Sequence, residues 1–274
     1  IVLMYHRFEE NKYPSTNIKI NDIKDQINLI KENNFTFVNP NKFEQELKSK
    51  DKKKRVLLTI DDGFLSFYEN AWPILKKNQI PFILFVSTKE IGSSNYMNWD
   101  QIKEVFSYNF THIGNHSHSH GYLVDKDKDE IKEDLIKSIE IFKEKLNHES
   151  EFFSYPFGEY SLELKKIVEN LNFKYAFGQH SGVLDETKDL LEMPRFPINE
   201  KYGKIERFKT LLKTLPFKYV KILPDEKYIS NESNPPKISI EFFKNLKNYK
   251  LINCYSNEEN VWRKSEVKFY ENNK

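Results

Sequence analysis

Short apolar runs alternate with amphipathic segments along the first two hundred residues of the chain. The apolar runs are bounded by polar or turn-forming residues, which is typical of buried β-strands. We expect strands over residues 2–5, 56–60, 81–86, 111–115, 152–155 and 175–177.

The segments between these runs carry apolar residues at helical spacing, such as Ile23, Ile27 and Ile30. We expect helices over residues 20–33, 64–78, 99–106, 127–147 and 161–171. Repeated alternation of apolar strands and amphipathic helices predicts an α/β fold with a parallel sheet covered by helices. A barrel and an open doubly wound sheet both fit this pattern.

The pattern changes after about residue 215. Short β-prone runs follow at 218–223, 237–240 and 251–255, and Pro235 and Pro236 interrupt them. We therefore divide the chain into a first domain of residues 1–214 and a small β-rich C-terminal appendage of residues 215–274.

The composition narrows the class of protein. The net charge is +2, and Lys52–Arg55 is the only dense basic run among the 274 residues, so we expect no nucleic-acid partner. The sequence has eight glycines and no glycine-rich phosphate loop, so a nucleotide cradle is not expected either. No apolar run approaches the roughly 20 residues of a membrane span, and one cysteine, Cys254, allows no internal disulfide.

The compartment and the oligomeric state are not fixed by these features. We expect an exported protein of the periplasm or cell surface whose targeting segment lies outside this sequence, and a cytoplasmic location stays open.

Two adjacent carboxylates, Asp61 and Asp62, follow the strand expected over residues 56–60. In parallel α/β folds the C-terminal ends of the strands line the active site. A single carboxylate there is often only a turn residue or a helix N-cap. Two side by side repel each other and need a cation or a shared proton.

A histidine cluster, His116, His118 and His120, follows the strand expected over residues 111–115. In an extended segment or in a helical turn, His116 and His120 point to the same side. Two imidazoles and one carboxylate can hold a divalent metal and leave a position open for water, while the second carboxylate acts as a base. The two clusters together predict metal-assisted hydrolysis.

These motifs resemble those of the polysaccharide deacetylases, the fourth carbohydrate esterase family with its NodB-type homology domain. Thr59-Ile-Asp-Asp-Gly63 resembles the family's Thr-Phe-Asp-Asp-Gly, and His116–His120 matches its His-Ser/Thr-x-x-His. Ser154-Tyr-Pro-Phe-Gly158 resembles the third motif of one family branch, and Leu3-Met-Tyr-His6 resembles that branch's first strand. The resemblance covers roughly residues 1–200 and implies a distorted (β/α) barrel with about seven parallel strands.

The resemblance also implies a role for each residue of the two clusters. Asp61 corresponds to the catalytic base. Asp62, His116 and His120 correspond to the ligands of Zn²⁺, or of Co²⁺ or Ni²⁺ in the same site. His118 falls on a variable position, so we do not expect it to be a ligand.

Two departures from the family pattern require substitutes. The usual third-motif arginine, which pairs with the base, is Ser154 here, and we expect Arg195 to take its place. The family's general-acid histidine usually lies in a Leu-x-His context, which is absent here. We expect His180 to be the general acid instead. The alternatives are a surface arginine that pairs with any nearby acid and a structural loop histidine.

Aromatic residues near these motifs are candidates for contact with a sugar ring. We expect Trp99, Tyr155 and Phe157 to bind substrate, although Trp99 also fits a core position. By resemblance, the backbone N–H near Phe157 is a donor to the developing oxyanion.

The sequence therefore predicts a metal-dependent enzyme that hydrolyses N-acetyl groups from a glycan, such as an N-acetylglucosamine polymer, peptidoglycan or an exopolysaccharide. One alternative is an O-acetyl esterase acting on a polysaccharide. The other is a glycan-binding protein that keeps the deacetylase scaffold without turnover. In each case the expected partner is a carbohydrate.

Overall fold

The computed structural model describes residues 1–229, 231–244 and 249–270. The chain forms two compact units, Ile1–Pro216 and Phe217–Lys274. The first unit contains every residue to which the sequence assigns chemistry.

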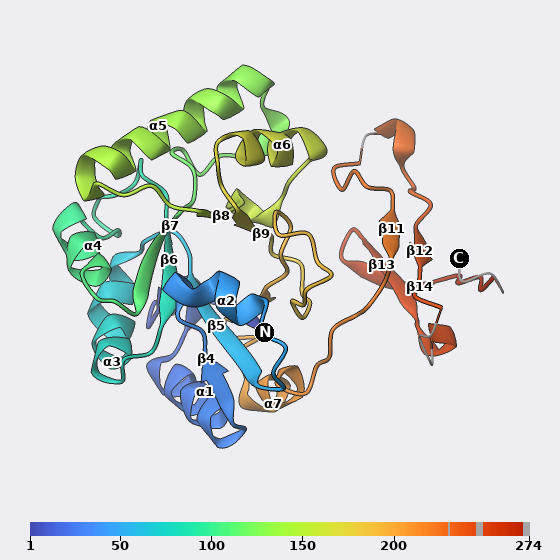
Figure 1. Cartoon of the computed structure of the whole chain (residues 1–274), viewed down its shortest axis with the longest axis horizontal. Coiled ribbons are helices and arrows are strands. Elements are labelled where there is room, and N and C mark those ends of the chain that lie inside the picture. Colours follow the sequence, from blue (N-terminus) through green and yellow to red (C-terminus); the bar gives the residue numbers. More distant parts are fainter. Residues whose placement is uncertain (230, 245–248, 271–274) are drawn as a thin grey trace. The chain divides into compact units, whose positions relative to one another are not determined.

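A curled sheet of parallel strands forms the centre of the first unit (Figure 1). The strand order is β10–β1–β5–β6–β7–β8–β9, and β4 pairs with β5 beside this path. The strands are β1 (Val2–Tyr5), β4 (Phe35–Phe37), β5 (Lys54–Ile60), β6 (Phe82–Val86), β7 (Thr111–Asn115), β8 (Phe152–Ser154), β9 (Tyr175–Phe177) and β10 (Phe196–Pro197). Each of these pairings is parallel. The predicted distorted (β/α) barrel is confirmed.

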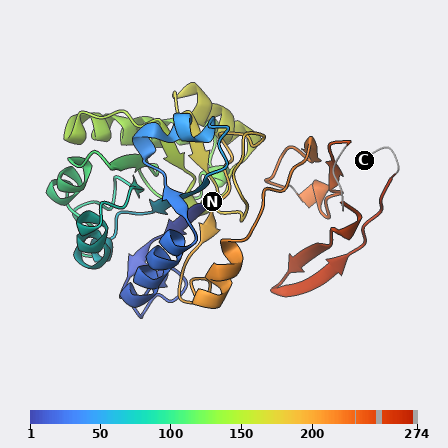
Figure 2. The ribbon, with the colours of Figure 1, turned by 60° about the horizontal axis from the view of Figure 1, so that its bottom comes forward.

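Helices surround this sheet (Figures 1 and 2). They are α1 (Ile20–Glu32), α2 (Phe43–Leu47), α3 (Trp72–Lys77), α4 (Trp99–Phe106), α5 (Lys128–Leu146), α6 (Leu162–Asn170) and α7 (Ile205–Leu211). Asn98 and Asp127 begin α4 and α5 with capping boxes, in which the cap side chain accepts a backbone N–H three residues later.

The helix expected over residues 64–78 is shorter and divided. A π-helical turn, Phe67–Ala71, leads into α3, and Pro73 lies in the first turn of that helix. Proline is tolerated there because the first N–H groups of a helix have no intrahelical partner. Trp72, at the start of α3, is buried.

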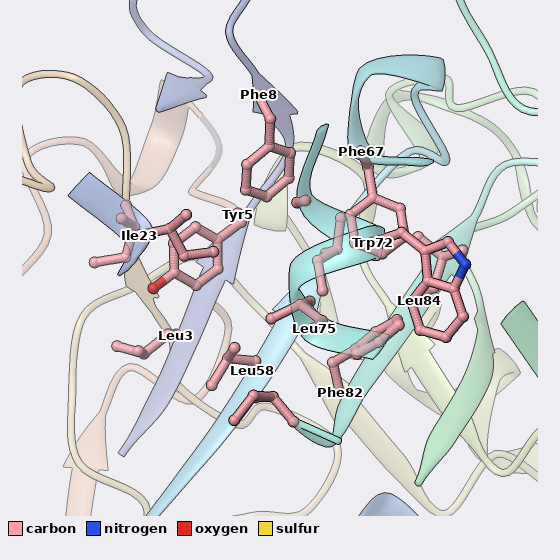
Figure 3. Packing of buried hydrophobic residues seen from close by; sticks show 14 of the residues in the cluster. Leu3, Tyr5, Phe8, Ile23, Leu58, Phe67, Trp72, Leu75, Phe82 and Leu84 are labelled. Carbon is pink, nitrogen blue, oxygen red and sulfur yellow. The ribbon is translucent and has the colours of Figure 1, made fainter. Parts of the chain in front are cut away.

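Alternation along the strands separates the apolar side chains that face the helices from those that face the barrel interior. Side chains such as Leu3, Tyr5 and Leu58 point to the helices and pack with Trp72 and Leu75 (Figure 3). Their neighbours along the strands point into the barrel, where the cluster includes Val2, Leu57, Ile83, Phe85, Phe177 and Met193. A residue's parity within its strand therefore decides whether it faces the helices or the barrel interior.

The barrel is almost closed by the segment of residues 193–197. Met193 forms a parallel bridge with Phe177 of β9, and Phe196 pairs with Leu3 of β1. One segment thus spans from one edge of the sheet to the other, and it carries Arg195 between its two ends.

Smaller elements complete the described chain. A parallel pair, β2 (Arg7–Phe8) and β3 (Asn17–Ile18), follows β1. The second unit has two antiparallel pairs, β11 (Lys221–Leu223) with β12 (Ser239–Glu241) and β13 (Cys254–Glu258) with β14 (Val261–Ser265). It is β-rich, as predicted, and the hairpin strand β14 was not foreseen. Among the described residues, no helix has the length and apolar character to cross a membrane.

Two histidines lie side by side where β7 begins. The ring of His112 lies 4.9 Å from that of His148 and 5.0 Å from that of Phe152, centroid to centroid. Burial and, to a smaller extent, the neighbouring His148 imidazole lower the pKa of His112 to about 3. Both imidazoles are therefore neutral at pH 7.

This arrangement makes barrel stability depend on pH. Unfolding restores the ordinary pKa of 6.5, so between pH 6.5 and about pH 3 the unfolded chain binds the extra proton. The free energy of unfolding therefore falls as the pH drops through this window, by at most about 1.4 kcal/mol per pH unit for this residue. We expect His112→Phe, which keeps a ring and removes the titration, to make the free energy of unfolding less dependent on pH. Urea unfolding followed by circular dichroism at about pH 7, 6 and 5 measures this free energy. The same pH dependence in the variant and the wild type would contradict the assignment.

Candidate active site

The two carboxylates reach one site because the backbone turns between them. Asp61 continues the inward-facing series of β5 that includes Leu57 and Thr59. Asp62 follows with a φ of 76°, in the left-handed region that few non-glycine residues adopt. Without this turn, alternation would send the second carboxylate away from the first.

Asp62, His116 and His120 form the group that can hold a metal ion. One ligand atom from each lies within 4.8 Å of the others. The Nε2 atoms of His116 and His120 lie 3.3 and 3.1 Å from Asp62 Oδ1. The two imidazoles hold the pKa of Asp62 well below its usual range, although burial alone would raise it.

The arrangement of the ligand atoms fits a bound cation. His116 Nδ1 donates a hydrogen bond to the carbonyl oxygen of Ser154 at 2.6 Å, so Nε2 is the ring nitrogen that faces Asp62 and could bind a metal. Asp62 Oδ1 is buried and has no hydrogen-bond partner of proper geometry among the described residues. A divalent cation between these atoms would satisfy all of them, and a set of two imidazoles and one carboxylate is a usual donor set for Zn²⁺.

The loop after β7 is held so that only two of its histidines face the carboxylates. Ser117 Oγ accepts the backbone N–H of His120, and Asp134 of α5 accepts that of His118. The His118 ring is hydrogen-bonded to Thr88 Oγ1 at 2.8 Å and is absent from the metal-binding group. Both Ser117 and His120 have positive φ, which turns the loop tightly.

Arg195 forms a two-pronged ion pair with Asp61 inside the barrel. Its Nη1 and Nη2 atoms each donate to one carboxylate oxygen at 2.8 Å. Both side chains are 0% exposed. Burial raises the pKa of Asp61, but the Arg195 guanidinium and the His116 imidazole outweigh it, so the pKa lies below its ordinary value.

Every polar edge of the guanidinium has a partner. Arg195 Nε donates to Gly178 O at 2.9 Å, Nη1 also donates to Thr59 Oγ1, and Nη2 to Ser154 Oγ at 2.8 Å. Ser154 Oγ in turn donates to Asp61 Oδ2 at 3.2 Å. Ser154 therefore contacts both members of the pair through its side chain, and orients His116 through its carbonyl. The sequence analysis considered Ser154 only as the position where the family's arginine is absent, so it did not predict these contacts of the serine.

His6 is a further residue of the site, and the sequence analysis assigned it no role. It directly follows β1 and lies beside Asp61, whose backbone N–H donates to Tyr5 O. Burial lowers the pKa of His6, and the charges of Asp62 and Asp61 act on its ring in the opposite direction. The signal in the sequence was its place directly after a buried strand, at the same end of the sheet as Asp61.

The three aromatic residues expected at the substrate lie in different environments. Tyr155 is fully buried, and its hydroxyl donates to Leu191 O, so the expected substrate contact of its ring is wrong. Because Ser154 points into the barrel, alternation sends Tyr155 to the core under α6. Trp99 packs against the apolar cluster that includes Leu3 and Trp72, and its ring centroid lies 6.3 Å from that of Phe142 in α5. Phe157 is exposed, and its ring lies 4.8 Å from that of His120.

His180 lies on the loop after β9. Its ring is exposed and lies 6.2 Å from that of Tyr160. Its carbonyl oxygen accepts the backbone N–H of Arg195. The neighbouring Gln179 packs so closely on Gly158 that a Cβ at Gly158 would lie 2.4 Å from that of Gln179. The loop of His180 is thus packed against the third motif.

Comparison with known proteins finds one family that the chain resembles. Residues 48–176 match the family model for polysaccharide deacetylase. The chain is 25% identical over 189 residues to the poly-β-1,6-N-acetyl-D-glucosamine N-deacetylase of Staphylococcus aureus (strain MRSA252), a match that covers 64% of this chain and 65% of that relative.

Two solved structures share the fold. IcaB from Ammonifex degensii has a TM-score of 0.70 and 25% identity, covering 78% of this chain and 97% of that one. Streptococcus pyogenes deacetylase PplD in complex with acetate has a TM-score of 0.70 and 24% identity, with the same coverage. The segment that matches the family model contains the aspartate pair, the histidine cluster and the Ser154–Gly158 motif. The chain is therefore similar to the polysaccharide deacetylases over the segment that carries these motifs.

Proposed function

We propose that this chain is a metal-dependent deacetylase that removes N-acetyl groups from a glycan of the poly-N-acetylglucosamine type. The observation that carries the proposal is the pairing of two sites. Asp62, His116 and the partly exposed His120 form a group in which Asp62 Oδ1 has no hydrogen-bond partner among the described residues. This group lies next to a buried Asp61 that is kept ionised by Arg195. The substrate class is suggested by the name of the S. aureus relative.

The metal would be held by Asp62, His116 and His120. Zn²⁺, Co²⁺ or Ni²⁺ bound there would polarise the acetyl carbonyl and lower the pKa of a water molecule. Asp61 is ionised at neutral pH because Arg195 lowers its pKa, so it can accept the proton of the attacking water. Arg195 holds both carboxylate oxygens, which fixes the direction in which the base acts.

Two further groups would complete the reaction. The backbone N–H of Phe157, at the turn after Pro156, would donate to the carbonyl oxygen as its negative charge develops. His180 would give a proton to the departing amine, which leaves poorly without one. The products would be acetate and a glycan with a free amino group.

The test of this proposal is acetate release from β-1,6-linked N-acetylglucosamine oligomers. Chitooligosaccharides and an O-acetylated polysaccharide are assayed in parallel, because the same metal and catalytic base would also hydrolyse an acetyl ester. The protein is stripped with a chelator and reloaded with Zn²⁺ or Co²⁺. We expect activity on the N-acetylated oligomers that disappears on stripping and returns on reloading. Activity on the O-acetylated polymer alone, or no activity on any substrate, would overturn the proposal.

We expect Asp61→Asn and Asp62→Asn to fail for different reasons. Asp61→Asn removes the base, so acetate release should fall by about 10²- to 10⁴-fold while Zn²⁺ binding persists. Asp62→Asn removes a ligand, so both Zn²⁺ binding and acetate release should fall. Isothermal titration with Zn²⁺ and an acetate assay measure the two properties. Ile136→Ala, on an exposed position of α5, is the control that should change neither. Loss of Zn²⁺ binding in Asp61→Asn would contradict the assignment.

Arg195→Gln should move the acid limb of the pH–rate profile. Burial raises the pKa of Asp61 and Arg195 lowers it, so removal of the arginine should raise this pKa. Asp61 is then protonated at higher pH, and the rate should begin to fall at higher pH than in the wild type. The profile of kcat/KM against pH measures the shift.

The same substitution should destabilise the barrel, by about 3–5 kcal/mol, because it leaves a buried carboxylate without its counter-charge. Adding Asp61→Asn should recover part of this loss, since the double variant has no unpaired charge. An unchanged acid limb together with additive destabilisation would show that Arg195 does not act through Asp61.

A further inference from the structure

An exposed pair of aromatic rings borders the metal-binding group. The rings of Tyr122 and Phe157 are stacked with centroids 3.9 Å apart and an interplanar angle of 1°. Tyr122 is 48% exposed and Phe157 is 38% exposed. Phe157 also contacts the ring of His120. One aromatic ring therefore separates Tyr122 from an imidazole of the metal-binding group.

Both rings are held in place by the chain around them. Leu123, next to Tyr122, is buried in the core under α5 and α6 and begins a short 3₁₀ turn, Leu123–Asp125. Asp125 N donates to Tyr122 O across this turn. Phe157 has a φ of 58°, which is unusual for a bulky residue and aims its side chain out of the third motif.

Packing in the apolar core does not explain why Tyr122 and Phe157 are exposed. Large apolar side chains in the barrel unit are mostly buried, whereas Tyr122 and Phe157 bury one face against each other and leave other surface to solvent. A parallel stack presents a flat outer face on Tyr122, with a hydroxyl at its edge. A pyranose ring has a flat C–H face and a polar rim, which matches an aromatic face with a polar tip.

We propose that Tyr122 and Phe157 form a sugar-binding subsite for the unit next to the one that is deacetylated. This inference rests on the proposed function and narrows it to a polymeric or oligomeric substrate. Phe157 lies against the metal-binding group, and Tyr122 extends the aromatic surface away from it. The subsite recognises ring shape and leaves the acetyl group to the residues around the metal.

A purely structural role for Tyr122 makes a different prediction. If its ring only supports Phe157 and His120, its removal should weaken reaction with every substrate equally and should loosen the metal. If its ring binds a neighbouring sugar, its removal should matter only for substrates long enough to reach it.

The experiment compares an N-acetylglucosamine pentamer with a small acetyl ester that lacks a sugar. Tyr122→Ala removes the ring, Tyr122→Leu keeps apolar volume without a flat face, and Tyr122→Phe keeps the face. Ile136→Ala is the control for loss of an exposed apolar side chain. KM and kcat for both substrates and the Zn²⁺ affinity are measured for each protein. Pentamer binding is also measured by calorimetry, which does not require turnover.

We expect Tyr122→Ala and Tyr122→Leu to raise KM and the dissociation constant for the pentamer by about tenfold relative to their effect on the small ester. Tyr122→Phe should stay close to the wild type. Equal losses on both substrates, weaker Zn²⁺ binding or unchanged pentamer binding would each overturn the subsite. Absence of acetate release by the wild type would instead overturn the proposed function, while the calorimetric comparison would still decide on Tyr122.

Discussion

The buried ion pair between Arg195 and Asp61 is the interaction on which the site depends. Burying two charges is unfavourable unless each is paired and its remaining hydrogen-bond capacity is filled. Gly178, Thr59 and Ser154 fill that capacity for the guanidinium. Arg195 lies on the segment that joins β9 to β1, so the segment that closes the barrel also carries the counter-charge of the base. A barrel without this segment would leave Asp61 as an uncompensated buried charge.

A second constraint is the strict alternation of strand side chains, which the site breaks only at its turns. Residues inside β5, β7 and β8 follow the period of two, and this places Asp61, His116 and Ser154 in the interior. Asp62, His120 and Phe157 have positive φ instead. Such conformations typically cost about 1–3 kcal/mol each in non-glycine residues. Their gathering around one metal-binding group indicates that the fold tolerates local strain where ligands must converge.

The strands and the aspartate and histidine clusters could be predicted from the sequence because periodicity and residue type are local signals. The contact between Arg195 and Asp61 could only be guessed, since 134 positions separate the two residues and no pattern encodes the closing segment, whose strand β10 has two residues. The expected role of Tyr155 was wrong because the motif match ignored strand parity. The stack of Tyr122 on Phe157 was not foreseen, because Tyr122 belongs to no motif.

The serine at position 154, where the family usually has an arginine, and the arginine at position 195 depend on each other. The guanidinium of Arg195 lies 2.8 Å from Ser154 Oγ and from both oxygens of Asp61. The Phe85 and Phe177 rings lie near it, with centroids 5.7 and 5.8 Å from Cζ. An arginine at position 154 would have to occupy the same enclosed volume. A small serine leaves room for the Arg195 guanidinium, and its hydroxyl hydrogen-bonds to Arg195 and Asp61. The serine is therefore compatible with an arginine that comes from a distant position in the sequence.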